Sequence, residues 1–177
     1  MSFWNDLKRE VGRLTDEAGK QVAKFKDASF ADASMAMCAL IAAADGSIDT
    51  AERNKTAAFI GINPVLQVFD VSKLQEKFNY FCRKLTEDFA FGKMEAMQTI
   101  GKLAGNTAKA TTLIQVGIII GGADGDFDPD EKQVVREVCT ALGIDHSVFD
   151  LKDDRPTQGQ HKTQEGAKDD GLADWMR

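Results

Sequence analysis

Hydrophobic residues recur along most of the chain at steps of three and four, which is the period of a helix that buries one side. No stretch alternates apolar and polar residues with the period of two that a half-buried strand requires. The pattern predicts an all-α fold, a bundle of about seven helices. The predicted helices cover residues 1–26, 29–44, 50–60, 71–85, 107–121 and 129–142, and one more runs from Phe91 to near Gly105 and Asn106. A short turn of helix starts at Asn63-Pro64.

Glycine and proline mark several of the predicted helix ends. Gly61 and Gly143 follow apolar helical runs, and glycine readily adopts the left-handed conformation that stops a helix. Pro129 stands at a first helical position, where its missing amide hydrogen costs nothing. The helix over 29–44 is apolar almost all round, so we expect it at the centre of the bundle.

The first 26 residues carry one apolar stripe on an otherwise charged helix. A basic amphipathic helix with Phe3 and Trp4 at its tip would suit peripheral contact with a membrane surface. The basic side chains are nearly balanced by acidic ones, which favours packing of the stripe on the bundle instead. The stripe consists of Phe3, Leu7, Val11, Leu14, Ala18, Val22 and Phe25.

The composition changes after residue 151. Residues 152–177 are polar and nearly free of large apolar side chains, so they cannot offset the entropy lost on ordering. The sequence therefore predicts a helical domain over 1–151 and a disordered tail over 152–177. The terminal LADWMR places Leu172, Trp175 and Met176 on this polar segment, either as a docking peptide or as a solvated end.

Charge and cysteine content narrow the classes of function. The net charge of −6 offers no basic stripe for nucleic acid, so cations and basic protein surfaces are the expected partners. No apolar run is long enough to span a bilayer and no signal peptide is evident, which predicts a cytoplasmic protein. Cys38, Cys82 and Cys139 are widely separated among apolar residues and are predicted to be buried thiols.

An acidic loop occurs twice in the sequence. ALIAAADGSIDTAER (39–53) aligns with IIIGGADGDFDPDEK (118–132) at an offset of 79 residues. Further along, GINPVLQVFD (61–70) is similar to GIDHSVFD (143–150). An internal duplication explains both matches, and it predicts two helical hairpins related by a pseudo-twofold axis.

Helix capping explains part of each loop without any ligand. The spacing Asp49 to Glu52, and again Asp128 to Glu131, fits a capping box, in which the first side chain accepts from a free amide and the second reaches back. Gly46 and Gly125 permit the turn, while Ile48 and Phe127 would anchor each loop in the core.

Capping does not account for every acid in the loops. Asp45 and Asp124 follow helices whose C-terminal ends disfavour negative charge, and a hard divalent cation bound by carboxylates would reverse this cost. The spacing of Asp124, Asp126 and Asp128 matches the first ligands of an EF-hand, but Pro129 replaces its obligatory glycine. The candidate metal ligands are Asp45, Asp49, Glu52, Asp124, Asp126, Asp128 and Glu131.

The chain resembles the tellurite resistance protein TerB family over about residues 1–151. The resemblance rests on the two ADG-x-[IF]-D-x-x-E loops, the opening MSFW, the stretches CALIAAADG and GIIIGGADGDFDPDEKQVVREV, and the terminal VFDL. The same helical domain resembles part of some membrane-anchored DnaJ-type co-chaperones. The TerB resemblance implies two related helical halves and association at the inner membrane with the integral membrane protein TerC. It also implies an acidic surface that binds divalent cations, Ca²⁺ being the expected ion. Ser47 and Ala51 replace two of the acids in the first loop, which makes it the weaker ligand set.

These features favour a non-enzymatic scaffold or sensor in a stress-response complex. No nucleophile–base pair supports catalysis, since His161 lies in the tail and His146 in a terminal turn. The alternative is direct thiol-based tellurite or redox chemistry, which needs an exposed thiol with a low pKa. A metal-dependent hydrolase would need both acidic loops at a shared two-metal centre, and it ranks last.

Overall fold

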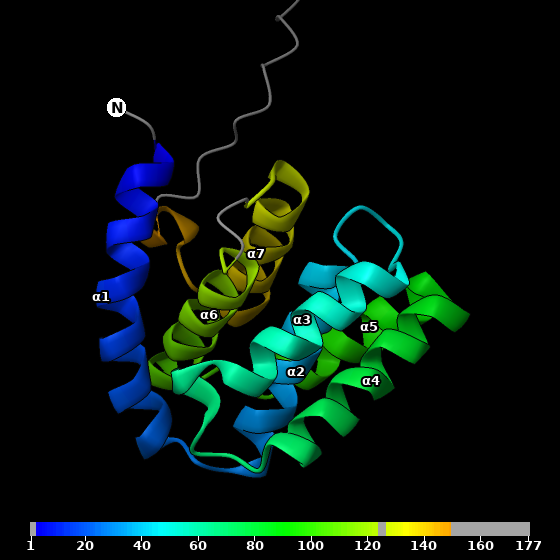
Figure 1. Ribbon diagram of the computed structural model, residues 1–177, viewed down its shortest axis with the longest axis horizontal. Helices are drawn as coiled ribbons and strands as arrows, with labels where there is room; N and C mark the ends of the chain where they lie inside the picture. Colours follow the sequence, from blue (N-terminus) through cyan, green and yellow to red (C-terminus); the bar gives the residue numbers. More distant parts are fainter. Residues whose placement is uncertain (1–2, 124–126, 150–177) are drawn as a thin grey trace, which may run out of the picture.

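The computed structural model describes residues 3–123 and 127–149, and within these ranges the chain forms seven α-helices and two short 3-10 helices with no strand (Figure 1). The predicted all-α class is confirmed. The predicted tail over 152–177 lies outside the described residues. The elements are α1 (Phe3–Lys24), α2 (Ala28–Ala42), α3 (Thr50–Ile62), η1 (Pro64–Leu66), α4 (Val71–Glu87), α5 (Phe89–Gly101), α6 (Thr107–Gly121), α7 (Pro129–Leu142) and η2 (His146–Phe149).

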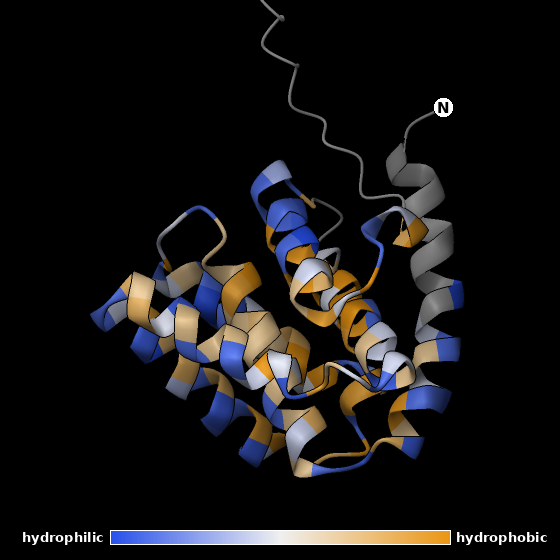
Figure 2. Cartoon of the chain, turned by 180° about the vertical axis from the view of Figure 1, so that it is seen from behind, coloured by the Kyte–Doolittle hydropathy of each residue, from blue (hydrophilic) through white to orange (hydrophobic). Residues whose placement is uncertain are grey.

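Helix α2 lies at the centre of the bundle, in contact with α4, α5 and α6 (Figure 1). Asp27 caps its start by accepting a hydrogen bond from the Phe30 amide at 2.8 Å. Met35 and Met37 are completely buried, and burial of such a side chain contributes about 1.5–3 kcal/mol. Helices α4 and α7 show one hydrophobic and one hydrophilic side (Figure 2), as the sequence pattern predicted.

Two glycines allow neighbouring helices to approach closely. A Cβ added to Gly117 of α6 would stand 2.2 Å from the terminal carbon of Met37 of α2. A Cβ on Gly92 of α5 would stand 2.6 Å from the backbone of Lys84 of α4. At Gly92 no side chain fits without displacement of the α4 backbone, so this glycine sets the spacing of α5 from α4. At Gly117 the obstacle is the Met37 side chain, which would have to move.

Several helix ends agree with the sequence. Helices α6 and α7 have the predicted bounds, and Gly143 ends α7 in the left-handed conformation with φ of 70°. Helix α2 ends two residues before the predicted limit, at Ala42. There the amide of Ala44 donates to the Ile41 carbonyl at 3.1 Å, so the chain leaves the helix through a tighter turn.

The prediction that Gly61 stops the third helix is wrong. Helix α3 continues to Ile62, and Asn63 ends it while accepting a hydrogen bond from the Val65 amide at 3.0 Å. A Cβ on Gly61 would stand 3.3 Å from the side-chain amide of Gln75 in α4. Gly61 therefore serves the close approach of α3 to α4, a packing role that looks the same as a stop signal in the sequence.

Helix α1 packs on the bundle through the C-terminal part of its apolar stripe. Ala18 and Val22 are completely buried, Phe25 packs against the core, and α1 contacts α6 and η1. Lys109 of α6 forms an ion pair with Asp27 beside this junction. The predicted packing of the stripe is thus confirmed for residues 18–25. None of the helices in the described part of the chain combines the length and the hydrophobicity that a membrane span requires.

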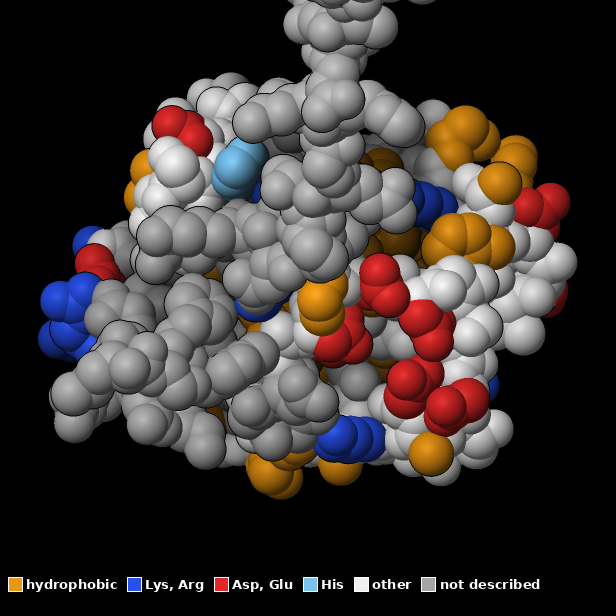
Figure 3. Space-filling model, turned by 90° about the horizontal axis from the view of Figure 1, so that it is seen from above, with side chains coloured by type: hydrophobic (Ala, Val, Ile, Leu, Met, Phe, Trp, Pro, Cys, Tyr) orange, Lys and Arg blue, Asp and Glu red, His pale blue; other side chains and the backbone are white. Residues whose placement is uncertain are grey.

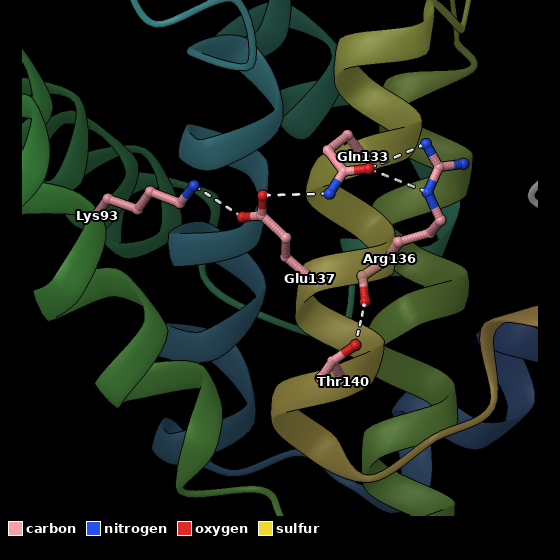
Figure 4. A network of polar contacts seen from close by, with 5 residues as sticks. All are labelled: Lys93, Gln133, Arg136, Glu137 and Thr140. Carbon is pink, nitrogen blue, oxygen red and sulfur yellow. Dashed lines mark hydrogen bonds and ion pairs between the residues drawn. The ribbon is translucent and has the colours of Figure 1, made fainter. Parts of the chain in front are cut away.

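A polar network joins α5 to α7 on the surface (Figure 4). Lys93 Nζ lies 2.7 Å from Glu137 Oε2, and Gln133 Nε2 donates to Glu137 Oε1 at 3.4 Å. Arg136 in turn donates to Gln133 Oε1 through Nε at 3.2 Å and Nη2 at 3.1 Å. Because the ion pair is partly exposed, its contribution is small, about 0.2–1 kcal/mol. The burial of Gly92, Ala96 and Ile100 sets the orientation of α5, and the network is compatible with it.

The close contact at Gly92 predicts a specific loss of stability. We expect Gly92→Ala to lower the free energy of unfolding by about 1–3 kcal/mol, because the added methyl group meets the backbone of α4. Gly19→Ala is the matched control, since nothing lies within 4 Å of its Cβ position. The control should leave stability unchanged or raise it by up to about 1 kcal/mol. Urea unfolding measures both, and equal behaviour of the two variants would contradict the packing role.

Candidate functional site

Both acidic loops lead into a capped helix. In the first, Asp49 Oδ1 accepts from the Glu52 amide at 2.8 Å, and the Asp49 amide donates to Glu52 Oε2 at 3.4 Å. In the second, Asp128 Oδ1 accepts from the Glu131 amide at 2.9 Å, and the Asp128 amide donates to Glu131 Oε2 at 2.9 Å. The two predicted capping boxes are confirmed, and each uses one oxygen of each of its carboxylates.

Asp45 has a local partner that the sequence analysis did not anticipate. Its Oδ1 accepts from the Ser47 amide at 3.0 Å and from the Ser47 hydroxyl at 3.1 Å. Such a side-chain bond two residues ahead forms an Asx turn. Gly46 occupies the middle of this turn with φ of 95°, a conformation that glycine adopts without strain. The turn holds the Asp45 carboxylate at the end of α2.

The second loop is anchored by an aromatic ring. Phe127 is completely buried, and its ring lies so close to α6 that a Cβ on Gly121 would meet it at 2.6 Å. Ile48, its counterpart in the first loop, is partly buried and packs against the same core. The predicted anchoring is confirmed at both positions. Because the anchors hold the loop ends, the first residues of α3 and α7 have defined positions.

The two loops meet at one end of the bundle. They contribute acidic side chains to a single cavity of about 220 Å³. Asp45 and Glu52 come from the first loop, and Asp128 and Glu131 from the second. Seen from this end, acidic side chains form one group on the surface (Figure 3). The structure thus brings together four of the seven candidate ligands.

The other candidates are placed differently. Asp49 caps α3 but is not among the residues that line the cavity. Asp124 and Asp126 lie outside the described residues. Within residues 3–123 and 127–149, no three His, Cys, Asp or Glu side chains are grouped as metal ligands would be.

Several residues of the cavity were missed in the sequence. Its apolar wall includes Ile41 and Ile120, from the ends of α2 and α6, while Lys55, Thr56 and Phe59 follow Glu52 along α3. The last three stand three, four and seven positions after Glu52, which places all of them on one side of a helix. That spacing was a usable signal. The contribution of α2 and α6 was not, because it depends on the packing of the hairpins.

The negative charge of the cavity affects the pKa of Glu52. Desolvation raises the pKa of this carboxyl above its ordinary value of 4.5, and the nearby charges of Asp49, Asp45 and Asp128 raise it further. The hydrogen bond from the Asp49 amide acts in the opposite direction. Repulsion therefore crosses from the second loop to the first, as expected if both loops share one electrostatic environment.

The environment of the three thiols does not favour reactivity. Cys38, Cys82 and Cys139 are all buried, which confirms the prediction. Desolvation raises the pKa of Cys38 and Cys82 to about 12 and that of Cys139 to about 11. Since the thiolate is the nucleophile, these groups offer almost none of it at neutral pH.

The chain is similar to proteins of tellurium resistance. The family model described as "Tellurite resistance protein TerB" matches residues 31–153. A protein from Alcaligenes sp., named "Tellurium resistance protein TerB", is 30% identical over 118 residues, which cover 67% of this chain and 97% of the relative. No solved structure matches the chain. The matched region contains both acidic loops.

The raised pKa of Glu52 predicts a pH-dependent effect on stability. A carboxyl with a raised pKa binds more protons in the folded state, so its contribution to stability falls as pH rises above 4.5. Glu52→Gln keeps a capping acceptor and removes the charge. We expect the variant to be more stable than the parent at pH 7, with the difference vanishing near pH 4. Urea unfolding in the presence of a chelator measures it.

The control for this measurement is Glu76→Gln, which removes an exposed carboxylate of α4 outside the cavity. It corrects for the change of net charge alone. A Glu52→Gln effect that stayed constant between pH 4 and 7, or that Glu76→Gln reproduced, would show that the loops do not repel each other through Glu52.

The burial of the thiols predicts slow chemical labelling. In native buffer, all three cysteines should react with a thiol reagent far more slowly than in urea, because burial blocks access and suppresses the thiolate. Mass spectrometry of the labelled chain identifies which residue reacts. Rapid modification of any one cysteine without denaturant would favour thiol chemistry in this protein.

Proposed function

Because the chain belongs to the TerB family of tellurite resistance proteins, we propose that it acts in this resistance as a non-enzymatic scaffold or sensor whose acidic cavity takes up a divalent cation. In this proposal the protein responds to binding of the cation, and partner proteins bind the acidic end of the bundle. No step of this proposal requires bond making or breaking by the chain itself.

The observation that carries the proposal is the convergence of the two loops. Asp45 and Glu52 are separated from Asp128 and Glu131 by more than seventy positions in sequence, yet all four line one cavity. Mutual repulsion is a cost in the absence of a counter-charge, as the raised pKa of Glu52 indicates. Uptake of a cation offsets that cost, and so couples binding to the relative positions of α3 and α7.

The donor set suits a hard cation. The groups are carboxylates, which Ca²⁺ and Mg²⁺ prefer, while the buried cysteines are not available as soft ligands. The caps use one oxygen each of Glu52, Asp128 and Glu131, and coordination in the cavity would use the other. Lys55 lines the same cavity and moderates its negative charge. A bound Ca²⁺ would supply positive charge there, and Asp124 and Asp126 would add further oxygens from the second loop.

The proposed setting is a complex at the inner face of the inner membrane. The partner implied by the resemblance is the integral membrane protein TerC, and a basic cytoplasmic surface of such a partner would complement the acidic end of this bundle. A cation in the cavity would lower the negative charge presented to that surface. Loading would therefore regulate the association.

Calorimetric titration of the full chain with Ca²⁺, Mg²⁺ and Zn²⁺, after removal of metals by a chelator, tests the cavity. We expect binding heat, strongest with Ca²⁺, and a loss of affinity of about tenfold or more in the combined variant Asp45→Asn, Asp128→Asn and Glu131→Gln. These substitutions keep hydrogen-bond acceptors at the caps, because Asn is as good an N-cap as Asp.

The matched control is Asp70→Asn with Asp88→Asn, which alters the N-caps of α4 and α5 outside the cavity. It should bind as the wild type does. No heat with any of the three ions, or equal binding by the wild type and the cavity variant, would refute a cation site. Co-purification of the same variants with TerC from solubilised membranes is the second readout, and unchanged recovery would separate the cavity from the association.

A further inference from the structure

Helix α5 is apolar almost all round, although one side of it is exposed to solvent. Its sequence, FAFGKMEAMQTIG, has only Lys93 and Glu95 as charged residues. A helix that is apolar almost all round is normally covered on every side. Gly92, Ala96 and Ile100 are indeed buried against the bundle.

The outer side of the helix is not covered by any described residue. Phe91 is 56% exposed and Met94 is 48% exposed, and they stand one turn apart. Ala90 is exposed beside them, and Met97 is partly buried at the margin. These four residues, Ala90, Phe91, Met94 and Met97, form what we name the α5 stripe.

The borders of the α5 stripe are fixed by polar contacts to both neighbouring helices. On one side Lys93 is paired with Glu137 of α7 (Figure 4). On the other side Glu95 accepts a hydrogen bond from the Tyr80 hydroxyl of α4. At 100° per residue, the stripe falls between Lys93 and Glu95 on the helix surface. Rotation of α5 to bury the stripe would break both contacts and expose Gly92, Ala96 and Ile100, so only another segment could cover the stripe.

We propose that residues 169–177, DDGLADWMR, dock on the α5 stripe. Leu172, Trp175 and Met176 have the spacing i, i+3 and i+4, which would place them on one side of a helix if the segment became helical on docking. An amphipathic helix with this spacing inserts its apolar side into an apolar groove or against an apolar helix. These are the large apolar side chains of the polar segment after residue 151.

The connecting segment is long enough for this contact. Residues 150–168 provide 19 positions, which reach about 60 Å when extended. A folded domain of this size has a radius of gyration of only about 15 Å. Reach therefore does not restrict the docking site, and the choice among surfaces falls to apolar area and charge.

Charge disfavours the acidic cavity as the docking surface. The segment carries Asp169, Asp170 and Asp174 close to its apolar residues, and the carboxylates of the cavity would repel them. At the stripe, Lys93 is already paired with Glu137, and α5 carries Glu95 as well as Lys102 at its C-terminal end, so charge there neither favours nor opposes docking. The proposal is independent of cation binding in the acidic cavity.

The natural tryptophans allow a direct test in the full chain. Trp4→Phe leaves Trp175 as the fluorophore. We expect its emission to be shifted to the blue relative to the urea-unfolded chain, and its quenching by acrylamide to be reduced severalfold. Phe91→Asp with Met94→Asp should abolish both effects. Ile62→Asp is the control, because Ile62 is an apolar residue on another helix that is 69% accessible, more than either Phe91 or Met94.

A variant within residues 169–177 tests the same contact without altering the helical domain. Leu172→Asp lies outside the helical domain and should release Trp175 as the α5 variant does, with unchanged helical circular dichroism. An unfolded-like emission of Trp175 in the parent chain would overturn the proposal, as would an emission that the α5 variant leaves unchanged. A blue shift that grows with protein concentration, together with dimers in ultracentrifugation, would assign the stripe to a second copy and would also overturn it.

Discussion

The direct packing of α6 against α2 governs the position of the candidate site. The two helices approach closely because Gly117 leaves room for Met37, and Gly121 leaves room for Phe127 and Ile41. Each helix leads into an acidic loop, so helices packed with corresponding ends together bring both loops to one end of the bundle. The convergence of charge is thus a consequence of apolar packing, and the core supplies the energy that holds like charges together.

Capping and repulsion act on the same side chains. Asp49, Glu52, Asp128 and Glu131 stabilise the starts of α3 and α7, where the positive end of a helix attracts negative charge. The same placement turns Glu52, Asp128 and Glu131 toward a shared cavity, and the raised pKa of Glu52 indicates the cost. An acidic loop can therefore be justified locally by its cap while its ligand-binding potential arises only between loops. This explains why capping and cation binding were hard to separate in the sequence.

Individual elements show why some structural features were predictable. The bounds of α6 and α7 follow from Asn106, Pro129 and Gly143, whose effects act on the nearest turn of helix. Gly61 was misread, because a glycine needed for close contact with α4 and one needed for a left-handed stop look identical in one dimension. In the candidate site, the capping partners were recognised from spacing of three residues. The Asx turn of Asp45 was missed, since it depends on the backbone path after α2.

The sequence by itself determined the helical class, the capped starts of α3 and α7, the burial of the cysteines and the duplicated acidic motif, because each depends on neighbours within a few residues or on hydrophobic period. Only the tertiary structure decided that Asp45 and Glu52 share a cavity with Asp128 and Glu131, that Ile41 and Ile120 wall it, and that Phe91 and Met94 are left exposed. The pseudo-twofold relation between the hairpins stays a prediction. Which faces meet is set by the shapes of whole helices in contact, and that information is distributed over residues far apart in the chain.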